Sequence, residues 1–196
     1  MSHRPRRFAS ALGCVAGALA MLGTSAPVHA GCTDLPAWLA TGCDRLVDTW
    51  ENGRSGVFIS GYAWHLPFTW TPERRRELNS KAWGTGYTRV TEDADGDEHS
   101  VYALVFSDSH KHAQFNVGYE YSTFWGPRNG VQPGLGFTAF VMQRPDIASG
   151  IPVPALLPVV ALRYRDATLF TTYIPTLNGG INHGSTLYVF GRILLE

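Results

Sequence analysis

A strict alternation of bulky apolar side chains with small or polar ones constrains this chain more than any other feature. It is clearest in residues 113–125, where the two kinds of side chain occupy opposite parities. The two sets are Phe115, Val117, Tyr119, Tyr121 and Trp125 against Gln114, Asn116, Gly118, Glu120 and Ser122. Because successive side chains of a strand point to opposite faces, this segment is predicted to be a β-strand with one apolar face. Weaker versions predict further strands at 57–65, 82–90, 98–108, 132–143, 156–165, 168–175 and 185–195.

The connections between these eight expected strands alternate between short and long, which is typical of an up-and-down barrel. Two kinds of barrel or sandwich remain possible from the strands alone. A soluble sandwich or lipocalin-like barrel would bury the large apolar face, whereas an outer-membrane barrel turns it toward lipid. The membrane form is favoured by the tryptophan-rich strands and by a signal peptide for export, which is described below. We therefore expect an all-β fold, an eight-stranded antiparallel up-and-down transmembrane β-barrel with an N-terminal amphipathic α-helix.

The first 30 residues have the pattern of a secretory signal peptide. Residues 1–7 carry three arginines, residues 8–23 form a short apolar run, and Val28-His29-Ala30 supplies the small residues of a cleavage site. The apolar run is shorter than the ~20 residues of a membrane helix. The expected organisation is a signal peptide at 1–30 that is removed, a periplasmic-side amphipathic helix within 31–55 and the barrel at 56–196.

The segment after the cleavage site carries a predicted helix and the two cysteines of the mature chain. Apolar residues recur at intervals of three and four between Asp34 and Glu51, with a break or bend expected at Gly42. The helix could pack on a soluble core or lie in a membrane interface. Cys32 and Cys43 could form a disulfide in an oxidising compartment, or remain two free thiols.

Charge and metal-ligating residues exclude several classes of function. The chain has 16 basic and 16 acidic side chains, so its net charge predicts no nucleic-acid partner. His110 and His112 sit at strand spacing, yet no cysteine or carboxylate spacing accompanies them, so we expect neither a metal nor a cofactor. The acidic run at 92–98 resembles a calcium loop only loosely, and a hairpin turn at Asp95-Gly96 is the favoured interpretation.

Polar residues gather where the odd-numbered strands end. If the helix precedes the first strand on the periplasmic side, His65, Asp108 and Ser109 all reach the opposite, outer rim. Side-chain parity turns His65 and Ser109 inward, and turns Asp108 away unless strand pairing has already ended there. A histidine base, a hydroxyl and a carboxylate are the ingredients of acyl transfer. The plainer interpretation is an ordinary rim histidine beside a turn built on Asp and Ser.

The predicted barrel interior has room for a slender apolar guest. Six glycines fall on the inward parity: Gly61, Gly84, Gly86, Gly118, Gly134 and Gly136. Eight strands enclose just enough space for packed side chains or one small ligand. Pro158, at the start of the sixth strand, and Pro175, at the end of the seventh, remove ladder donors, which either protects strand ends or opens a lateral door to the membrane.

Several motifs in this order and spacing resemble the PagP family of outer-membrane lipid A palmitoyltransferases. They include Tyr62-Ala63-Trp64-His65, Phe106-Ser107-Asp108-Ser109, Gly134-Leu135-Gly136-Phe137-Thr138 and Thr172-Tyr173-Ile174-Pro175. The resemblance implies a monomeric outer-membrane enzyme that moves a palmitoyl chain from a glycerophospholipid to a hydroxyl of lipid A, with its catalytic rim facing outward. It also implies that His65, Asp108 and Ser109 are catalytic, and that Pro158 and Pro175 flank lateral access.

The chain departs from the family pattern at the floor of the acyl-chain cavity, which we assign to Gly118 and Glu120. Glu120 stands where the family commonly has a glycine, and its parity points inward. A carboxylate there must be protonated, wetted or paired, for example with Asn116. We therefore expect an acyl chain no longer than palmitate. Two other functions fit the strand pattern: a non-catalytic barrel that binds a lipid or partner through its outer loops, and an outer-membrane phospholipase.

Overall fold

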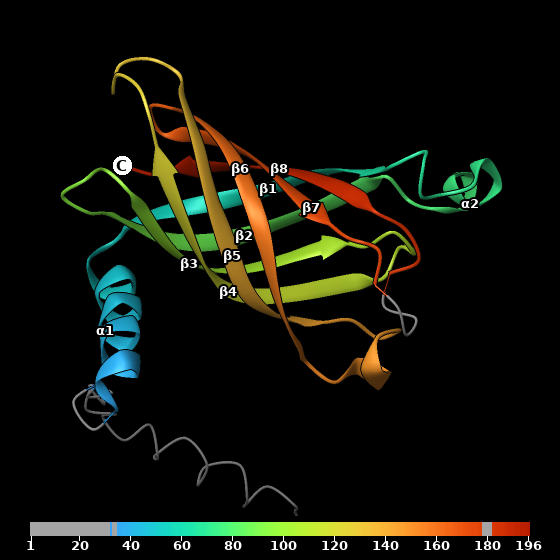
Figure 1. The fold of residues 1–196 in the computed structure, drawn as a ribbon, viewed down its shortest axis with the longest axis horizontal. Helices are drawn as coiled ribbons and strands as arrows, with labels where there is room; N and C mark the ends of the chain where they lie inside the picture. The colour runs from blue at the N-terminus through green and yellow to red at the C-terminus, as the bar shows by residue number, and fades with distance from the viewer. Residues whose placement is uncertain (1–31, 33–34, 178–181) are drawn as a thin grey trace, which may run out of the picture.

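In the computed structural model, which describes residues 32, 35–177 and 182–196, eight antiparallel strands close into one barrel (Figure 1). Each strand pairs with its neighbours in sequence, and the first pairs with the last. The strands are β1 (Arg54–His65), β2 (Lys81–Glu92), β3 (Glu98–Ser107), β4 (Ala113–Phe124), β5 (Gln132–Gln143), β6 (Val153–Tyr164), β7 (Ala167–Ile174) and β8 (Thr186–Leu194). The predicted up-and-down barrel is confirmed, and the predicted signal peptide lies outside the described residues.

The outer wall of the barrel is apolar, whereas its interior contains many buried polar side chains beside an apolar cluster. Val117 and Leu156 are exposed to 63% and 67%, while Asn116 and Glu120 on the opposite face of β4 are buried. A barrel surrounded by water would place these two kinds of side chain the other way round. The structure therefore supports the membrane form over the soluble one. In the part of the chain that the structure describes, no helix has the length and apolarity to cross a membrane.

A β-bulge in β1 changes one predicted orientation. The register with both neighbours shifts between Ser60 and Tyr62, and against β8 Gly61 is the extra residue. Gly61 lies exposed, so its predicted inward position was wrong. Phe58, before the bulge, is 2% exposed inside the barrel, whereas Tyr62, four residues later in the chain, is 49% exposed on the outer wall. A bulge adds one residue to one strand and so reverses the parity beyond it. His65 follows the bulge and keeps its predicted inward position, 4% exposed.

Helix α1 (Ala37–Asn52) is attached to the barrel at the end opposite His65 (Figure 1). It runs through Gly42 without the expected break. Its last turn is held by Arg89 of β2, whose guanidinium donates to the carbonyl oxygens of Trp50 and Glu51 at 2.9 Å each. Gly53 ends the helix where a Cβ would lie 2.7 Å from the backbone nitrogen of Val90, which only glycine allows.

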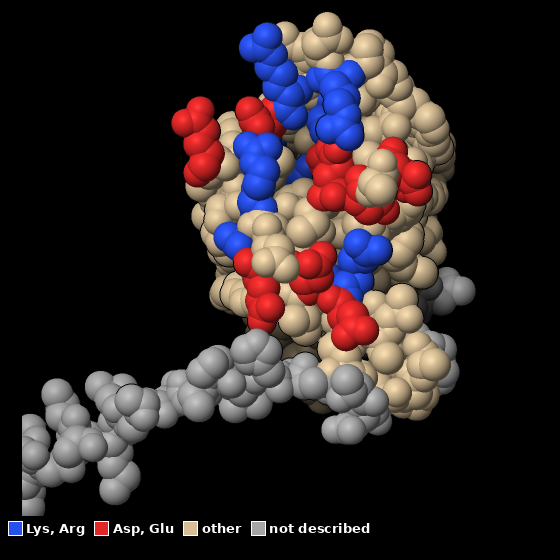
Figure 2. Space-filling model, turned by 90° about the vertical axis from the view of Figure 1, so that its left-hand side faces the viewer, with Lys and Arg blue, Asp and Glu red and all other residues tan. Residues whose placement is uncertain are grey.

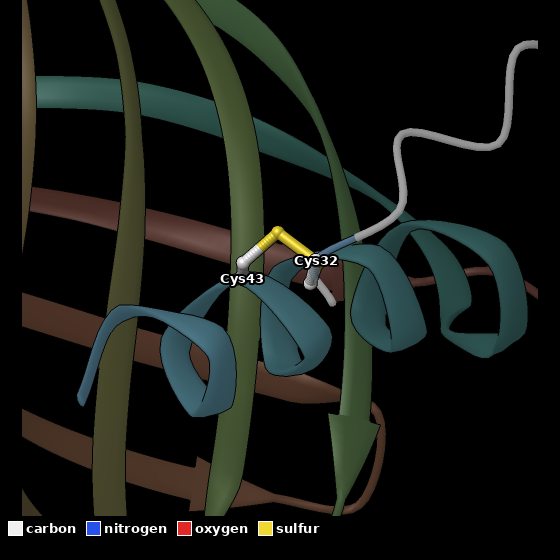
Figure 3. The surroundings of a disulfide bond; sticks show 2 residues. All are labelled: Cys32 and Cys43. Carbon is white, nitrogen blue, oxygen red and sulfur yellow. A yellow bond between two sulfur atoms is a disulfide. The ribbon is translucent and has the colours of Figure 1, made fainter. Parts of the chain in front are cut away.

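Three large apolar side chains of α1 are exposed in the part of the chain that the structure describes. Leu39, Leu46 and Trp50 are exposed to 41%, 43% and 59%. A helix packed on a soluble core would bury them, so the structure favours a helix that lies in a membrane interface. The disulfide is formed: Cys32 and Cys43 are joined beside the helix, as Figure 3 shows.

The α1 end of the barrel carries charged side chains of both signs. Figure 2 views this end, where positively and negatively charged side chains lie next to one another. Here the connections between strands are short, and Arg54 pairs with Asp166 at 2.8 Å. The longer connections lie at the other end, with α2 (Pro72–Glu77) between β1 and β2 and the 3-10 turn η2 (Ala148–Gly150) between β5 and β6.

Candidate active site

His65 and Ser109 meet at the rim opposite α1. His65 is the last residue of β1, and Ser109 belongs to the connection between β3 and β4. His65 Nε2 lies 2.9 Å from Ser109 Oγ. The backbone nitrogen of Asn79 donates to the Ser109 carbonyl oxygen at 2.8 Å, which ties this connection to the one that precedes β2. A buried imidazole within hydrogen-bond reach of a hydroxyl is the arrangement that acyl-transfer chemistry uses.

Two residues that the sequence analysis did not single out hold the other side of the imidazole. Ser80 Oγ lies 3.4 Å from His65 Nδ1. The Trp70 ring meets His65 edge to face at 5.7 Å, and its Nε1 donates to the Ser185 carbonyl oxygen at 3.0 Å. Both residues belong to the long β1–β2 connection, and their place on the rim is the only signal that could have pointed to them.

Asp108 does not contact His65 among the described residues. Its Oδ1 accepts hydrogen bonds from the backbone nitrogens of His110 at 2.8 Å and His112 at 2.7 Å. Pairing between β3 and β4 ends at Ser107 and Ala113, so Asp108 has left the ladder and parity no longer fixes its direction. The carboxylate therefore shapes the turn that carries Ser109, which is a local role typical of aspartate.

Arg144 joins this turn to the β5–β6 connection. Its Nε lies 3.2 Å from Asp108 Oδ2 and donates to Asp146 Oδ1 at 2.7 Å, while Nη2 donates to Asp146 Oδ2 at 3.0 Å. Because the single Nε hydrogen points to Asp146, the Asp108 contact is an ion pair without a hydrogen bond. Burial raises the pKa of the Asp146 carboxyl, but the Arg144 hydrogen bonds and charge outweigh it and leave that pKa below its usual range.

A cavity inside the barrel is lined by side chains from seven of its strands, all but β2. Most are apolar or aromatic, including Phe58, Leu104, Phe106, Tyr188 and Phe190. Of the two predicted floor residues, Glu120 borders this cavity. Gly118 is not among the lining residues, because the Tyr102 hydroxyl lies 2.9 Å from the place of its missing Cβ. Gly118 thus allows the tyrosine to approach rather than leaving empty space.

The floor beside Glu120 is a buried network of charged groups. Arg192 Nη1 lies 3.4 Å from Glu120 Oε2, and Ser122 donates to the other Glu120 oxygen. Arg192 also pairs with Glu98, which pairs in turn with Arg163 at 2.7 Å. Among the alternatives for Glu120, the structure thus shows pairing, but the suggested partner was wrong, since Asn116 accepts a hydrogen bond from Gln114 at 3.0 Å instead.

The wall is unpaired between β6 and β7 on the rim side. Their register runs only from Val159 with Thr172 to Tyr164 with Ala167. Pro158 is the next residue of β6, and its carbonyl oxygen accepts a hydrogen bond from Thr172 Oγ1 at 2.7 Å. Pro175 follows the end of β7. A proline has no N–H to donate, and the ladder ends at Val159, directly beside Pro158. Pro175 lies three residues beyond Thr172, the last residue of β7 that pairs with β6.

Comparison with known proteins gives consistent matches over most of the chain. A family model described as "Antimicrobial peptide resistance and lipid A acylation protein PagP" matches residues 45–192. A Bordetella parapertussis protein named lipid A acyltransferase PagP is 37% identical over 161 residues, which cover 82% of this chain and 87% of that protein. Proteins of the same name from Methylobacillus flagellatus and Legionella pneumophila are 36% and 39% identical, covering 84% and 78% of this chain and 88% and 80% of theirs.

Proposed function

This chain belongs to the PagP family of lipid A acylation proteins, and on that basis we propose that it is an outer-membrane acyltransferase. It transfers an acyl chain from a glycerophospholipid to a hydroxyl group of lipid A, and so modifies lipopolysaccharide. The observation that carries the proposal is the contact of 2.9 Å between His65 Nε2 and Ser109 Oγ at one mouth of a closed barrel. A non-catalytic barrel has no need of this buried pair.

The reaction needs a base for the acceptor hydroxyl and a donor of hydrogen bonds for the ester carbonyl. His65 Nε2 takes the proton as the lipid A hydroxyl attacks the phospholipid ester, and returns it to the leaving lysophospholipid oxygen. Ser109 either donates its hydroxyl hydrogen to the carbonyl oxygen or forms an acyl intermediate. Ser80, 3.4 Å from Nδ1, orients the imidazole. Asp108 positions Ser109 through the turn whose amides it binds.

The same geometry supports a route for the substrates. The acyl chain of the donor enters the interior cavity, whose lining is mostly apolar. The unpaired stretch bounded by Pro158 and Pro175 serves as the lateral entrance, because it opens the wall on the rim side of the barrel. The His65 rim faces outward, where lipid A lies, and α1 lies on the periplasmic side. Closure of the barrel within one chain supports a monomer.

A transferase and a phospholipase differ in what happens without an acceptor. We expect the purified protein in detergent to release lysophospholipid and acylate lipid A when both substrates are present. Without lipid A, release should fall to a small fraction of that rate. Mass spectrometry of both products measures this, with Ser109→Ala protein as the matched control. Equal release of free fatty acid with and without lipid A would favour a phospholipase, and no turnover in either case would favour the non-catalytic barrel.

We propose that Glu120 limits the length of the acyl chain. Its carboxylate borders the cavity and is held by Arg192 at 3.4 Å, so a chain terminus cannot push it aside without breaking a buried ion pair. We expect transfer of chains no longer than palmitoyl from a mixture of phospholipids. Shortening the side chain in Glu120→Ala should shift the preference toward longer chains.

Mass spectrometry of lipid A after incubation with mixed donors tests this limit. Asn116→Ala is a matched control, because Asn116 borders the same cavity on the same strand without taking part in the ion pairs. A wild-type preference for chains longer than palmitoyl would contradict the assignment of Glu120. So would an unchanged preference in Glu120→Ala protein that remains folded and active.

A further inference from the structure

We propose that the outer rim binds a divalent transition-metal ion through Asp108, His110, His112 and Asp146, a set that we call the rim cluster. The first three residues lie in the β3–β4 connection and the fourth in the β5–β6 connection. This site is distinct from the His65–Ser109 contact. Its ligands would be Asp108 Oδ2, the two histidines of the β3–β4 connection, and Asp146 of the β5–β6 connection.

The ligand atoms already lie close to the spacing of a metal site. Asp108 Oδ2 lies 3.7 Å from His112 Nδ1 and 4.0 Å from His110 Nδ1. His110 Nδ1 lies 3.6 Å from Asp146 Oδ2. Ligand atoms of Asp108, His112 and Asp146 all fall within 4.8 Å of one another. Around a tetrahedral zinc ion with bonds of about 2.0–2.2 Å, ligand atoms are roughly 3.4 Å apart. The pairs at 3.6–4.0 Å would close by roughly 0.2–0.6 Å on binding, and the widest pair by at most about 1.4 Å.

A second observation, independent of this spacing, is a buried carboxylate oxygen that lacks a hydrogen bond. The Asp108 side chain is only 1% exposed, and its Oδ2 accepts no hydrogen bond from any described residue. Oδ1 is already used by two backbone amides. Buried polar atoms without a partner are rare, and each one calls for an explanation. A metal ion between Oδ2 and the two imidazoles would provide one.

Arg144 competes with the metal ion for the same carboxylates. Its guanidinium makes two hydrogen bonds to Asp146 and lies 3.2 Å from Asp108 Oδ2. It supplies the positive charge that two neighbouring carboxylates need when no metal is bound, but it leaves Oδ2 without a hydrogen bond. Metal binding would therefore displace the Arg144 side chain from Asp146. The presence of Arg144 is expected to lower the affinity of the rim cluster for the metal ion.

The donor set selects the class of metal. Two imidazoles with two carboxylates suit Zn²⁺ and its neighbours Co²⁺, Ni²⁺ and Cu²⁺, whereas Ca²⁺ and Mg²⁺ prefer all-oxygen sites. The sequence predicted no metal because no carboxylate spacing accompanied His110 and His112. Asp146 comes from a distant part of the chain, and the structure brings it to the two histidines. His110 and His112 are about half exposed, which leaves the ion a path of entry.

Titration with Co²⁺ tests the site directly. Untagged mature protein in detergent, treated with a chelator and dialysed, is titrated with CoCl₂ and followed by its visible d–d absorption, with ZnCl₂ added to compete. We expect one ion per chain. The double variant His110→Ala/His112→Ala should lose affinity by about tenfold or more, as expected when metal ligands are removed. His183→Ala, in the β7–β8 connection, is the matched control and should bind as the wild type does.

Replacing Arg144 separates this proposal from the alternative that Arg144 only links the two connections through its ion pairs. Arg144→Gln should bind Co²⁺ more tightly than the wild type, by roughly tenfold, which corresponds to about 1.4 kcal/mol. Circular dichroism of each variant confirms the barrel. The proposal is overturned if the wild type shows no saturable binding, if the double histidine variant binds equally well, or if Arg144→Gln binds no more tightly than the wild type.

Discussion

Replacing His65 with alanine is expected to lower the rate of lipid A acylation by roughly 10²- to 10⁴-fold, the usual contribution of a positioned general base. The imidazole is buried and lies 2.9 Å from Ser109 Oγ. Alanine leaves no acceptor at this position for the proton of the attacking hydroxyl. Initial rates of acyl transfer to lipid A in detergent micelles, followed by mass spectrometry, measure the loss. A His65→Ala protein that is folded and as active as the wild type would sink the assignment.

Substitutions of Asp108 show whether it acts on the imidazole or on the turn. Asparagine keeps an oxygen that can accept from the amides of His110 and His112, whereas alanine does not. If Asp108 acts through the turn, Asp108→Asn should keep much more activity than Asp108→Ala. In a Ser-His-Asp triad, by contrast, asparagine in place of the acid is severely damaging because it favours the wrong imidazole tautomer. An Asp108→Asn protein as inactive as His65→Ala would therefore mean that Asp108 reaches His65 during the reaction.

Arg192→Met is expected to cause the largest loss of stability of any single substitution in the barrel interior. Arg192 is fully buried and pairs with both Glu98 and Glu120. Removing one partner of a buried ion pair leaves uncompensated charge, which typically lowers the free energy of unfolding by about 3–5 kcal/mol. Guanidinium unfolding in lipid or detergent, followed by tryptophan fluorescence, measures the change. Methionine is unbranched and fills much of the space of the arginine stem, so the lost charge is expected to contribute more than the cavity.

Arg54→Met is the matched control for this prediction. Arg54 pairs with Asp166 at the same end of the barrel, but both side chains are about half exposed. An exposed pair of this kind typically contributes ~1 kcal/mol or less. Adding Glu120→Gln to Arg192→Met should recover part of the loss, because it removes one of the unpaired carboxylates. If Arg192→Met destabilises the protein no more than Arg54→Met does, the network is not a source of stability.

The strands could be predicted closely because the lipid-facing and inward-facing residues of a membrane barrel alternate along each strand and differ in polarity. In β4 and β5 the predicted and observed segments differ by at most one residue at either end. β6 begins at Val153, earlier than expected, because its rim-side half pairs only with β5 and so tolerates Pro154 and Pro158. The bulge at Gly61 could not be predicted, since a single glycine in an alternating run looks like any other small residue.

The candidate site was predicted in its location more than in its contacts. Strand counting placed His65 and Ser109 on one rim, and the structure shows their contact. The partners of Asp108 and Glu120 were not predictable, because they depend on side chains brought together from distant segments. Asp108 turns to Arg144, and Glu120 to Arg192. The partners in both pairs are far apart in the sequence, so no local motif indicates either pair.

The short ladder between β6 and β7 also decides where this barrel is mechanically weakest. Six residue pairs join β6 to β7, whereas nine join β1 to β8, where the two ends of the barrel meet. Tension around the circumference would therefore part the sheet between β6 and β7 before it unzips the closing seam. In the proposed route, the lipid tail would pass sideways between β6 and β7, while the longer β1–β8 ladder keeps the barrel closed.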